Sequence, residues 1–498
     1  MKNKIINILT VILILVLSIF LVFSEEIGDL DELWQYSFAN NLCNGLVPYR
    51  DFNIITTPLF SFVAAIFLKI FSNQLITMRL FNLLVFSSIL FIAYKIFELL
   101  KMDKIKSLLC VIILYFLFYF DLGVEYNYFI LLITLIFLYF ELYNINKYGV
   151  FNLKCDVALG ILIGLTIITK HTIGFILSFM FIFYKILFIH NKNDWLIIKK
   201  IIIQRILGVL IPCILLLIYL LLNDALYDCI DYCILGILEF KNKVSYLDLF
   251  FNRNILIGLF AFIVPIFLLS TIALFKYRKN NKFTIILIML IYSIMMFIGM
   301  FPIANSGHFI IYAFIGIMTS LYIIYIIIKK LIKNKKIKIF INTFIKYAIV
   351  LFLLFYVSKN SLVLIKLYKN NNICKNELEH YYGILINENM IRHVSTVDNY
   401  ILQKKEEGKK VYILDASAVM YVIPINIYNK NYDMFNKGNL GKNGEEKLIN
   451  EIQEAENTIY LLLKDEYSKN WQTPLEVIDF VKNNKSKIGE IEIFDIYE

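Results

Sequence analysis

The stretch VALGILIGLTIITKHTIGFILSFMFIFYKILFI, residues Val157–Ile189, decides the topology of this chain. It is apolar along most of its length but is interrupted by Lys170 and His171. A spanning helix needs about 20 apolar residues, so the stretch forms either one long span or a tight hairpin of two short spans. The two short spans would be Val157–Thr169 and Ile173–Ile189. The two interpretations place all later loops on opposite sides of a membrane.

The distribution of lysine and arginine distinguishes the two interpretations, because basic loops favour the cytoplasmic side of a membrane. With the hairpin, all the basic loops fall on one side, whereas with a single span the last three fall on the other. These loops carry Lys2/Lys4, Lys101/Lys104/Lys106, Lys147/Lys154, Lys192/Lys199/Lys200, Lys276/Arg278/Lys279/Lys282 and Lys329–Lys338. The sequence therefore predicts the hairpin, with the N-terminus inside and the C-terminus outside.

The composition is that of an all-α polytopic membrane protein. Of the 498 residues, 59% are hydrophobic and 18% are charged, which is too apolar for a soluble globular protein. The formal charge of +10 is explained by loop orientation rather than by nucleic-acid binding. A further apolar segment, Leu59–Phe71, predicts an interfacial or re-entrant helix. About eleven spans, several of them short, are predicted: Ile5–Phe23, Leu75–Leu100, Ser107–Phe120, Tyr128–Tyr143, Val157–Thr169, Ile173–Ile189, Ile201–Leu222, Ile255–Phe275, Phe283–Phe301, Phe309–Ile328 and Ile339–Val357.

The composition changes after the last span, so the sequence predicts two domains. Residues 1–358 form a transmembrane domain with a large first outer loop over 24–74, and residues 359–498 form a small extracytoplasmic α/β domain. In the second domain, KKVYILD, NTIYLLL and EIEIFDIY are typical of strands, and GEEKLINEIQEAE and PLEVIDFVKNN are typical of helices. Their alternation indicates a β-α-β-α-β order.

Two further motifs have ordinary explanations. GNLGKNG, residues 438–444, resembles a phosphate-binding loop, but no strand directly precedes it and no GK[ST] follows, so we expect a turn before a helix. Cys229 and Cys233 are four residues apart, which places them on one face of a helix. The sequence leaves open whether they form a disulfide.

The chemistry-bearing residues gather on the predicted outer side. The outer segments are the loop 24–74, the turns DLGVEYN (121–127), TKHT (169–172) and FPIANSGHF (301–309), the loop 223–254 and the tail. The inner loops are short and basic. Asp31 and Glu32 come just after the first span, where they either mark a solvated helix start or supply a catalytic base.

The residues after these acids resemble a known family. LWQYSFANNLCNG (33–45), LVPYRDF (46–52) and TTPLFSFVAAIFLKIF (56–71) are similar to the first extracytoplasmic loop of the GT-C superfamily of membrane glycosyltransferases. The likeness is closest to the branch of protein O-mannosyltransferases and lipid A aminoarabinose transferases. VEYN, GLTIITKHTIG and FPIANSGHF also resemble outer turns of this family, so the resemblance covers residues 1–330.

The resemblance implies a glycosyltransferase that uses a polyprenyl-phosphate-linked sugar. Asp31 matches the catalytic acid position of the family and Glu32 is its partner. The reaction also needs cations to hold the phosphate leaving group. Arg79 is a candidate because an intramembrane arginine is costly and therefore usually functional. The further candidates for substrate binding are Glu125, Lys170, His171, His308 and Arg50.

Two of these residues also have a structural interpretation. Arg50 is as well suited to a surface ion pair with Asp51 as to a substrate, and His308 is as well explained as an ordinary interfacial histidine. No divalent metal and no other cofactor is predicted from the sequence.

The expected partners are the lipid-linked donor, an extracytoplasmic glycan, lipid or protein acceptor, and membrane lipids, but not nucleic acid. The expected location is the plasma membrane, with several spans and an extracytoplasmic active face. Two other functions compete with transfer. A transporter or flippase of lipid-linked intermediates would favour charges along the middle of several spans. A non-catalytic cell-envelope assembly protein would need no acid at residue 31.

Overall fold

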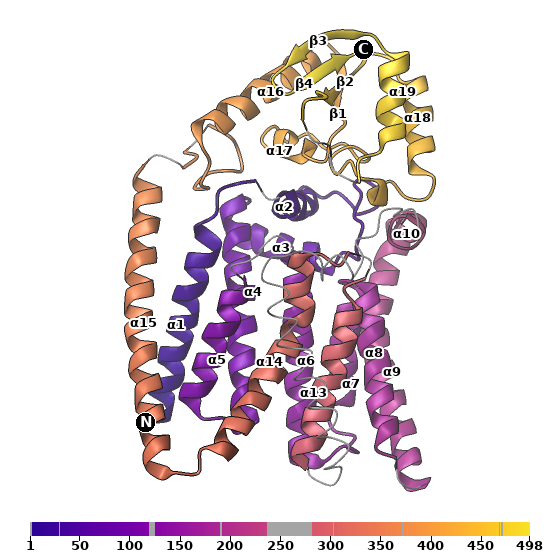
Figure 1. Ribbon diagram of the computed structural model, residues 1–498. Coiled ribbons are helices and arrows are strands. Elements are labelled where there is room, and N and C mark those ends of the chain that lie inside the picture. Colours follow the sequence, from indigo (N-terminus) through magenta and orange to yellow (C-terminus); the bar gives the residue numbers. More distant parts are fainter. Residues whose placement is uncertain are drawn as a thin grey trace. The chain divides into compact units, whose positions relative to one another are not determined.

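The computed structural model describes most of the chain, and its contacts divide it into two units. The described residues are 2–28, 30–118, 125–189, 192–236, 281–301, 303–370, 373–375, 377–467, 469 and 472–498. The first unit comprises Met1–Val22, Asn82–Leu215 and Val244–Ile365, and we call it the helical unit. The second comprises Phe23–Phe81, Leu216–Lys243 and Lys366–Glu498, and we call it the mixed unit. Figure 1 labels their elements.

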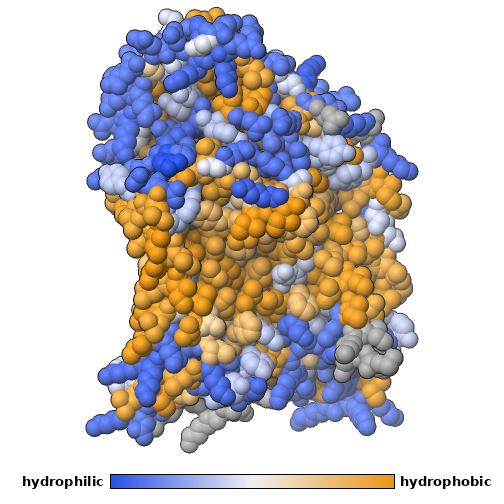
Figure 2. Space-filling view, turned by 180° about the vertical axis from the view of Figure 1, so that it is seen from behind, coloured by the Kyte–Doolittle hydropathy of each residue, from blue (hydrophilic) through white to orange (hydrophobic). Residues whose placement is uncertain are grey.

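The helical unit is built from apolar helices. Among the described residues, five helices are long and apolar enough to cross a membrane, namely Leu75–Leu99, Tyr126–Tyr148, Lys192–Leu222, Gly307–Leu331 and Lys335–Lys369. The chain is thus compatible with a helical membrane protein, and hydrophobic side chains cover much of the face seen in Figure 2. The helices that lie wholly or partly in this unit are α1 (Lys2–Phe23), α4 (Leu75–Leu99), α5 (Lys104–Leu117), α6 (Glu125–Tyr148), α7 (Asp156–Ile167), α8 (His171–Leu187), α9 (Lys192–Leu222), α13 (Asn281–Ile298), α14 (Ser306–Leu331) and α15 (Lys335–Lys369).

These helices coincide with the predicted spans except for Ile255–Phe275, which lies outside the described residues. The stretch Val157–Ile189 forms two helices, α7 and α8, that pack against each other. The chain turns between them at Lys170. The turn is tight: a Cβ on Gly174 would lie 2.3 Å from Ile167 Cγ1, so a larger residue does not fit there. The hairpin interpretation of this stretch is therefore confirmed at the level of helices, whereas the count of eleven spans stays a prediction.

The mixed unit contains shorter helices and one sheet. Its helices are α2 (Leu30–Cys43), α3 (Leu59–Ile70), α10 (Leu226–Ile230), η2 (Asp231–Leu235), α16 (Glu388–Glu406), α17 (Ala418–Val422), η4 (Lys437–Asn439), α18 (Gly444–Glu454) and α19 (Leu475–Asn484). Helix α3 is the helix that the apolar segment Leu59–Phe71 predicted. Cys229 and Cys233 both remain free thiols.

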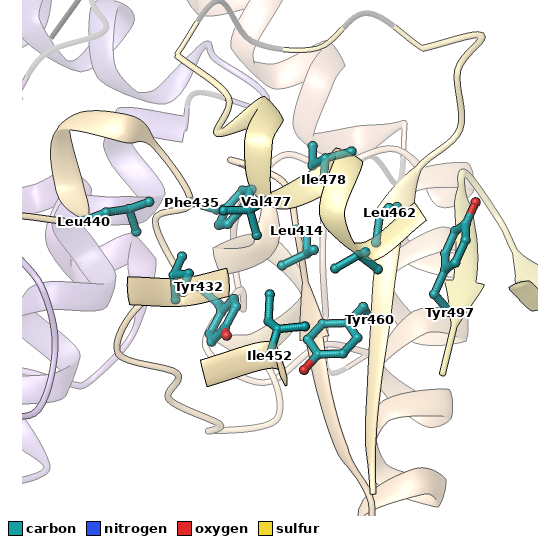
Figure 3. Packing of buried hydrophobic residues seen from close by; sticks show 12 residues of the cluster. Leu414, Tyr432, Phe435, Leu440, Ile452, Tyr460, Leu462, Val477, Ile478 and Tyr497 are labelled. Atoms are coloured by element: carbon teal, nitrogen blue, oxygen red, sulfur yellow. The ribbon is translucent and has the colours of Figure 1, made fainter. Parts of the chain in front are cut away.

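The sheet has the strand order β1-β2-β4-β3, with β1 (Lys410–Ile413) parallel to β2 (Thr458–Leu463) and β4 (Phe494–Tyr497) antiparallel to β2. All six residues of β2 are buried, which explains why it is a continuous apolar run. The parallel pair needs a crossover, and α18 lies in that connection. Figure 3 shows the core beside the sheet, where residues of β2, α18 and α19 meet. The predicted α/β module is present.

One predicted strand was wrong. EIEIFDIY was expected to be a single strand, but β3 (Lys487–Ile491) ends within it and turns back into β4, which pairs with β3. Glu492 sits in the turn with φ 51°. The hydrophobic alternation continues through the turn, and no Asn or Gly marks it, so the pattern hides the hairpin.

Segments that are distant in sequence are in contact within the mixed unit. Trp34 Nε1 donates to the Ala416 carbonyl at 3.1 Å, and Asn53 Nδ2 donates to the Asn439 carbonyl at 2.9 Å. The loop over 24–74 and the tail are therefore packed together, as expected if they lie on one side. The predicted domain boundary at residue 358 falls inside α15, whose last residues belong to this unit with the tail.

Candidate functional site

The first candidate group lies at the start of α2 in the mixed unit. Asp31 and Glu32 occupy the first turn of this helix, where the unpaired backbone N–H groups favour negative charge. Asp31 is half-buried and Glu32 is buried. Glu32 accepts two hydrogen bonds from Arg79, 2.7 Å from Nε to Oε1 and 2.8 Å from Nη2 to Oε2.

Arg79 is buried, and its guanidinium has several partners. Besides the two bonds to Glu32, its Nη1 donates to the Glu25 carbonyl at 2.7 Å. A planar guanidinium that is hydrogen-bonded on two edges is rigid, so it fixes the first turn of α2 against the beginning of α4. This geometry favours a positioning role for Glu32 and Arg79. The predicted roles of Glu32 in catalysis and of Arg79 in substrate binding stay predictions.

Arg50 forms the ion pair that its sequence context allowed. Its Nε lies 2.8 Å from Asp51 Oδ1 and its Nη2 lies 2.9 Å from Asp51 Oδ2. The hydrogen bonds from Arg50 lower the pKa of Asp51. The Arg50 side chain is 45% exposed, so this is a surface contact of the kind that contributes little to stability.

The second candidate group lies in the helical unit and is centred on Lys170. Its Nζ donates to Asn127 Oδ1 at 3.1 Å and to the Tyr312 hydroxyl at 2.9 Å, and that hydroxyl donates to Asn127 at 2.9 Å. The ammonium also lies 5.4 Å from the ring centres of both Tyr126 and Tyr312. Among the described residues, both hydrogen-bond partners of the Lys170 ammonium are neutral, so they do not cancel its charge.

His308 belongs to the same group. Its imidazole is buried and stacks on Tyr312, with ring centres 6.2 Å apart and planes 12° apart. Asn305 caps α14 by accepting from the His308 backbone N–H at 3.0 Å, and its Oδ1 also lies 2.8 Å from His308 Nδ1. The three predicted turns VEYN, TKHT and FPIANSGHF thus meet around Lys170.

The other two candidates begin helices of the same unit. His171 is the first residue of α8 and is partly exposed. Glu125 is the first residue of α6, and its side chain lies outside what the structure describes. Both roles stay predictions.

Sequence reasoning missed two members of the Lys170 group, Asn127 and Tyr312. The signals were present, because Asn127 ends VEYN and Tyr312 lies one helical turn after His308, at i+4. Asn127 Nδ2 is buried and has no hydrogen-bond partner among the described residues. An unused donor beside an ammonium is suited to an anion.

A buried charge cluster in the helical unit was also missed. Arg205 on α9 donates to Asp156 on α7 at 2.8 Å and to Glu141 on α6 at 2.7 Å. Lys185 on α8 lies 3.6 Å from Glu141. All four side chains are buried, and two acids balance two bases. The sequence signal for this cluster was the presence of charged residues inside apolar spans. We call these four residues the balanced cluster.

The loop GNLGKNG, which resembles a phosphate-binding loop, contacts the carboxylate of Asp231 in the same chain. Asp231 accepts from the Lys442 backbone N–H at 3.0 Å and from Lys447 Nζ at 2.9 Å. A Cβ on Gly441 would lie 2.4 Å from Asp231 Oδ2, so only glycine allows this approach. The loop precedes α18, as expected.

Within the residues that the structure covers, no three His, Cys, Asp or Glu side chains gather so that they could hold a metal ion. No protein-family model matches the chain, and a search of curated proteins finds no significant match.

Proposed function

We propose that this chain is a membrane glycosyltransferase of the GT-C type. It transfers a sugar from a polyprenyl-phosphate donor to an extracytoplasmic glycan, glycolipid or protein. The observation that supports this most is the Lys170 group, in which an ammonium with neutral partners and an unused amide donor are enclosed by apolar helices. A desolvated cation of this kind attracts an ionised phosphate strongly.

The proposed topology follows from the loop charges. The chain crosses the plasma membrane about eleven times, with the N-terminus in the cytoplasm and the C-terminus outside. The loop over 24–74 and the tail then face the outside. The contacts between these two segments support this arrangement.

The roles in the proposed reaction follow from the family resemblance of the first loop and the outer turns. Asp31 accepts the proton of the acceptor hydroxyl while that oxygen forms a bond to C1 of the sugar. The bond from C1 to the phosphate oxygen breaks on the opposite face of the sugar, and its electron pair stays on the phosphate. Lys170 and Asn127 donate hydrogen bonds to the departing phosphate, and the pair of Glu32 and Arg79 orients the turn that carries Asp31.

The balanced cluster is the observation that bears on the competing transporter function. Its four charges neutralise one another: Arg205 of α9 pairs with Asp156 of α7 and Glu141 of α6, and Lys185 of α8 lies beside Glu141. A transport site would need charges that exchange partners with a substrate or ion. The cluster therefore gives that alternative no specific support.

The test is transfer by purified protein in a bilayer, supplied with a panel of polyprenyl-phosphate sugars. Asp31→Asn should reduce turnover by roughly 10²- to 10⁴-fold, because general base catalysis typically contributes that much. Glu26→Gln is the matched control, since Glu26 is an exposed acid in the same loop, and it should retain wild-type turnover. Wild-type turnover in Asp31→Asn, or no transfer from any donor by the wild type, would overturn the proposal.

A further inference from the structure

An apolar groove lies in the helical unit between α5, α14 and α15. It has a volume of about 360 Å³, and its walls include Leu109 from α5, Ile324 from α14 and Ile341 from α15. Ile113 and Ile328 also line it and remain 39% and 44% exposed. A hydrocarbon chain is the natural occupant of such walls, because apolar surface is stabilised by leaving water.

Three lysines line the same groove, one from each helix: Lys106, Lys329 and Lys338. The Nζ atoms of Lys106 and Lys329 each lie 5.3 Å from the ring centre of Tyr325, and Lys329 Nζ donates to its hydroxyl at 3.2 Å. Asp103 Oδ2 lies 3.3 Å from Lys106 Nζ. One carboxylate does not neutralise three ammonium groups, so the groove carries a net positive charge.

The sequence around the groove strengthens this charge. Lys330 lies in the last turn of α14, Lys333 lies in the connection to α15, and Lys335 and Lys336 begin α15. Figure 1 shows this connection at the lower end of these helices. Clusters of four or more lysines beside a spanning helix are typical of segments that bind anionic lipid head groups.

The groove is separate from the Lys170 group. Tyr312 contacts Lys170 near the start of α14, whereas Tyr325 lies thirteen residues further along the same helix. At about 1.5 Å of rise per residue, the two tyrosines are roughly 20 Å apart along the helix axis.

We propose that this groove is a binding site for an anionic phospholipid of the bilayer. One acyl chain occupies the space between α5, α14 and α15, and the phosphate is held by Lys106, Lys329 and Lys338. Free phosphate would leave the apolar walls unfilled, and a zwitterionic lipid would leave the excess charge unmatched. The inference depends on membrane insertion and is independent of glycosyl transfer.

The experiment is native mass spectrometry of the purified chain after reconstitution with equal amounts of phosphatidylglycerol and phosphatidylcholine, followed by graded delipidation. The wild type should retain one phosphatidylglycerol. The variant Lys106→Gln/Lys329→Gln/Lys338→Gln should bind it at least tenfold more weakly. The matched control Lys192→Gln/Lys199→Gln/Lys200→Gln loses the same charge from exposed positions on α9, outside the groove, and should retain the lipid.

A second variant tests the groove rather than the charge. Ile113→Trp places a large side chain in the opening and keeps all lysines, so it should also lose the retained lipid. The proposal is overturned if both triple variants lose the lipid equally, if Ile113→Trp keeps it, or if both phospholipids are retained equally. Retention of a polyprenyl phosphate in place of a phospholipid, read from the bound mass, would also overturn it. Each protein is first checked by size exclusion for a monodisperse peak.

Discussion

Two charged groups in the helical unit differ in whether their charges are balanced by other residues. In the balanced cluster, Arg205 and Lys185 are matched by Glu141 and Asp156, so the protein supplies every counter-charge. Around Lys170, the hydrogen-bond partners are a carboxamide and a phenol. Removing one member of a balanced cluster leaves a buried charge without its partner and destabilises the fold, whereas a cation with neutral partners is suited to an anion from outside the protein.

The largest expected effect concerns the balanced cluster. Arg205→Met leaves the carboxylates of Glu141 and Asp156 buried with one ammonium between them, and breaking a buried pair costs about 3–5 kcal/mol. We expect a loss of about 5 kcal/mol in the free energy of unfolding, because two carboxylates lose a partner. Denaturant unfolding in detergent measures it.

A charge-balanced variant is the control for Arg205→Met. In Asp156→Asn/Arg205→Met one acid and one base are removed together, and Lys185 still faces Glu141. It should lose clearly less stability than Arg205→Met alone, because the two residues interact directly. Equal losses would show that Arg205 acts through its packing on Phe181, 3.5 Å from its ring centre, and not through its charge.

The pair of Glu32 and Arg79 should behave like the balanced cluster. Glu32→Gln leaves a buried guanidinium without its carboxylate, and we expect a loss of about 3 kcal/mol in stability, the lower end for a single broken pair. Asp31→Asn, one residue earlier, should leave stability nearly unchanged while turnover falls. A melting temperature for Glu32→Gln equal to that of the wild type would contradict the positioning role.

A lone buried acid in the mixed unit should give a pH-dependent effect. Asp398 on α16 is buried, and burial raises its pKa to about 8. Its folded form therefore holds a proton that the unfolded chain releases above about pH 4. Stability from this group is fully present below pH 4 and is lost as the pH rises towards 8, with a slope of about 1.4 kcal/mol per unit at most.

Asp398→Asn tests this sign, because asparagine stays neutral at every pH. Melting temperatures across pH 5 to 8 should decline less steeply for the variant than for the wild type. Asp479→Asn on α19 is a control that should keep the wild-type slope, since Asp479 is exposed. If the melting temperatures of the wild type and Asp398→Asn changed with pH in parallel, Asp398 would not hold a proton in the folded state.

The smallest expected effect concerns the exposed pair of Arg50 and Asp51. Because this pair is on the surface, Arg50→Gln should leave both the melting temperature and the turnover unchanged within error. A marked loss of turnover with normal stability would instead restore Arg50 to the substrate site.

The sequence predicted the helices and assigned three distant turns to one outer side, but it did not show which charges would pair. The turn at Lys170 could be predicted because the distribution of basic loops depends on the topology of the whole chain. Arg79 was recognisable as an unusual buried cation, yet its partner Glu32 lies 47 residues away and depends on tertiary packing. The balanced cluster joins four helices, so no local pattern specifies it.

Local sequence patterns also failed where one pattern fits two different structures or functions. The alternation in EIEIFDIY fits one strand or a hairpin equally well, and the turn at Glu492 uses a residue that seldom marks a turn. The acids at the start of α2 suit a helix start and a catalytic base alike, and the structure shows that Glu32 also serves a third purpose as the partner of Arg79.

The most direct test of the central claim is the affinity of the purified protein for a polyprenyl phosphate without sugar. Lys170→Met should weaken binding by roughly 10- to 100-fold, since a hydrogen bond to a charged group contributes about 1.5–3 kcal/mol. The same variant should melt no earlier than the wild type, because it removes a half-buried charge whose hydrogen-bond partners among the described residues are neutral. Lys200→Met, an exposed lysine on α9, should bind like the wild type. Equal affinities of Lys170→Met and the wild type would contradict the claim that this group receives the donor phosphate.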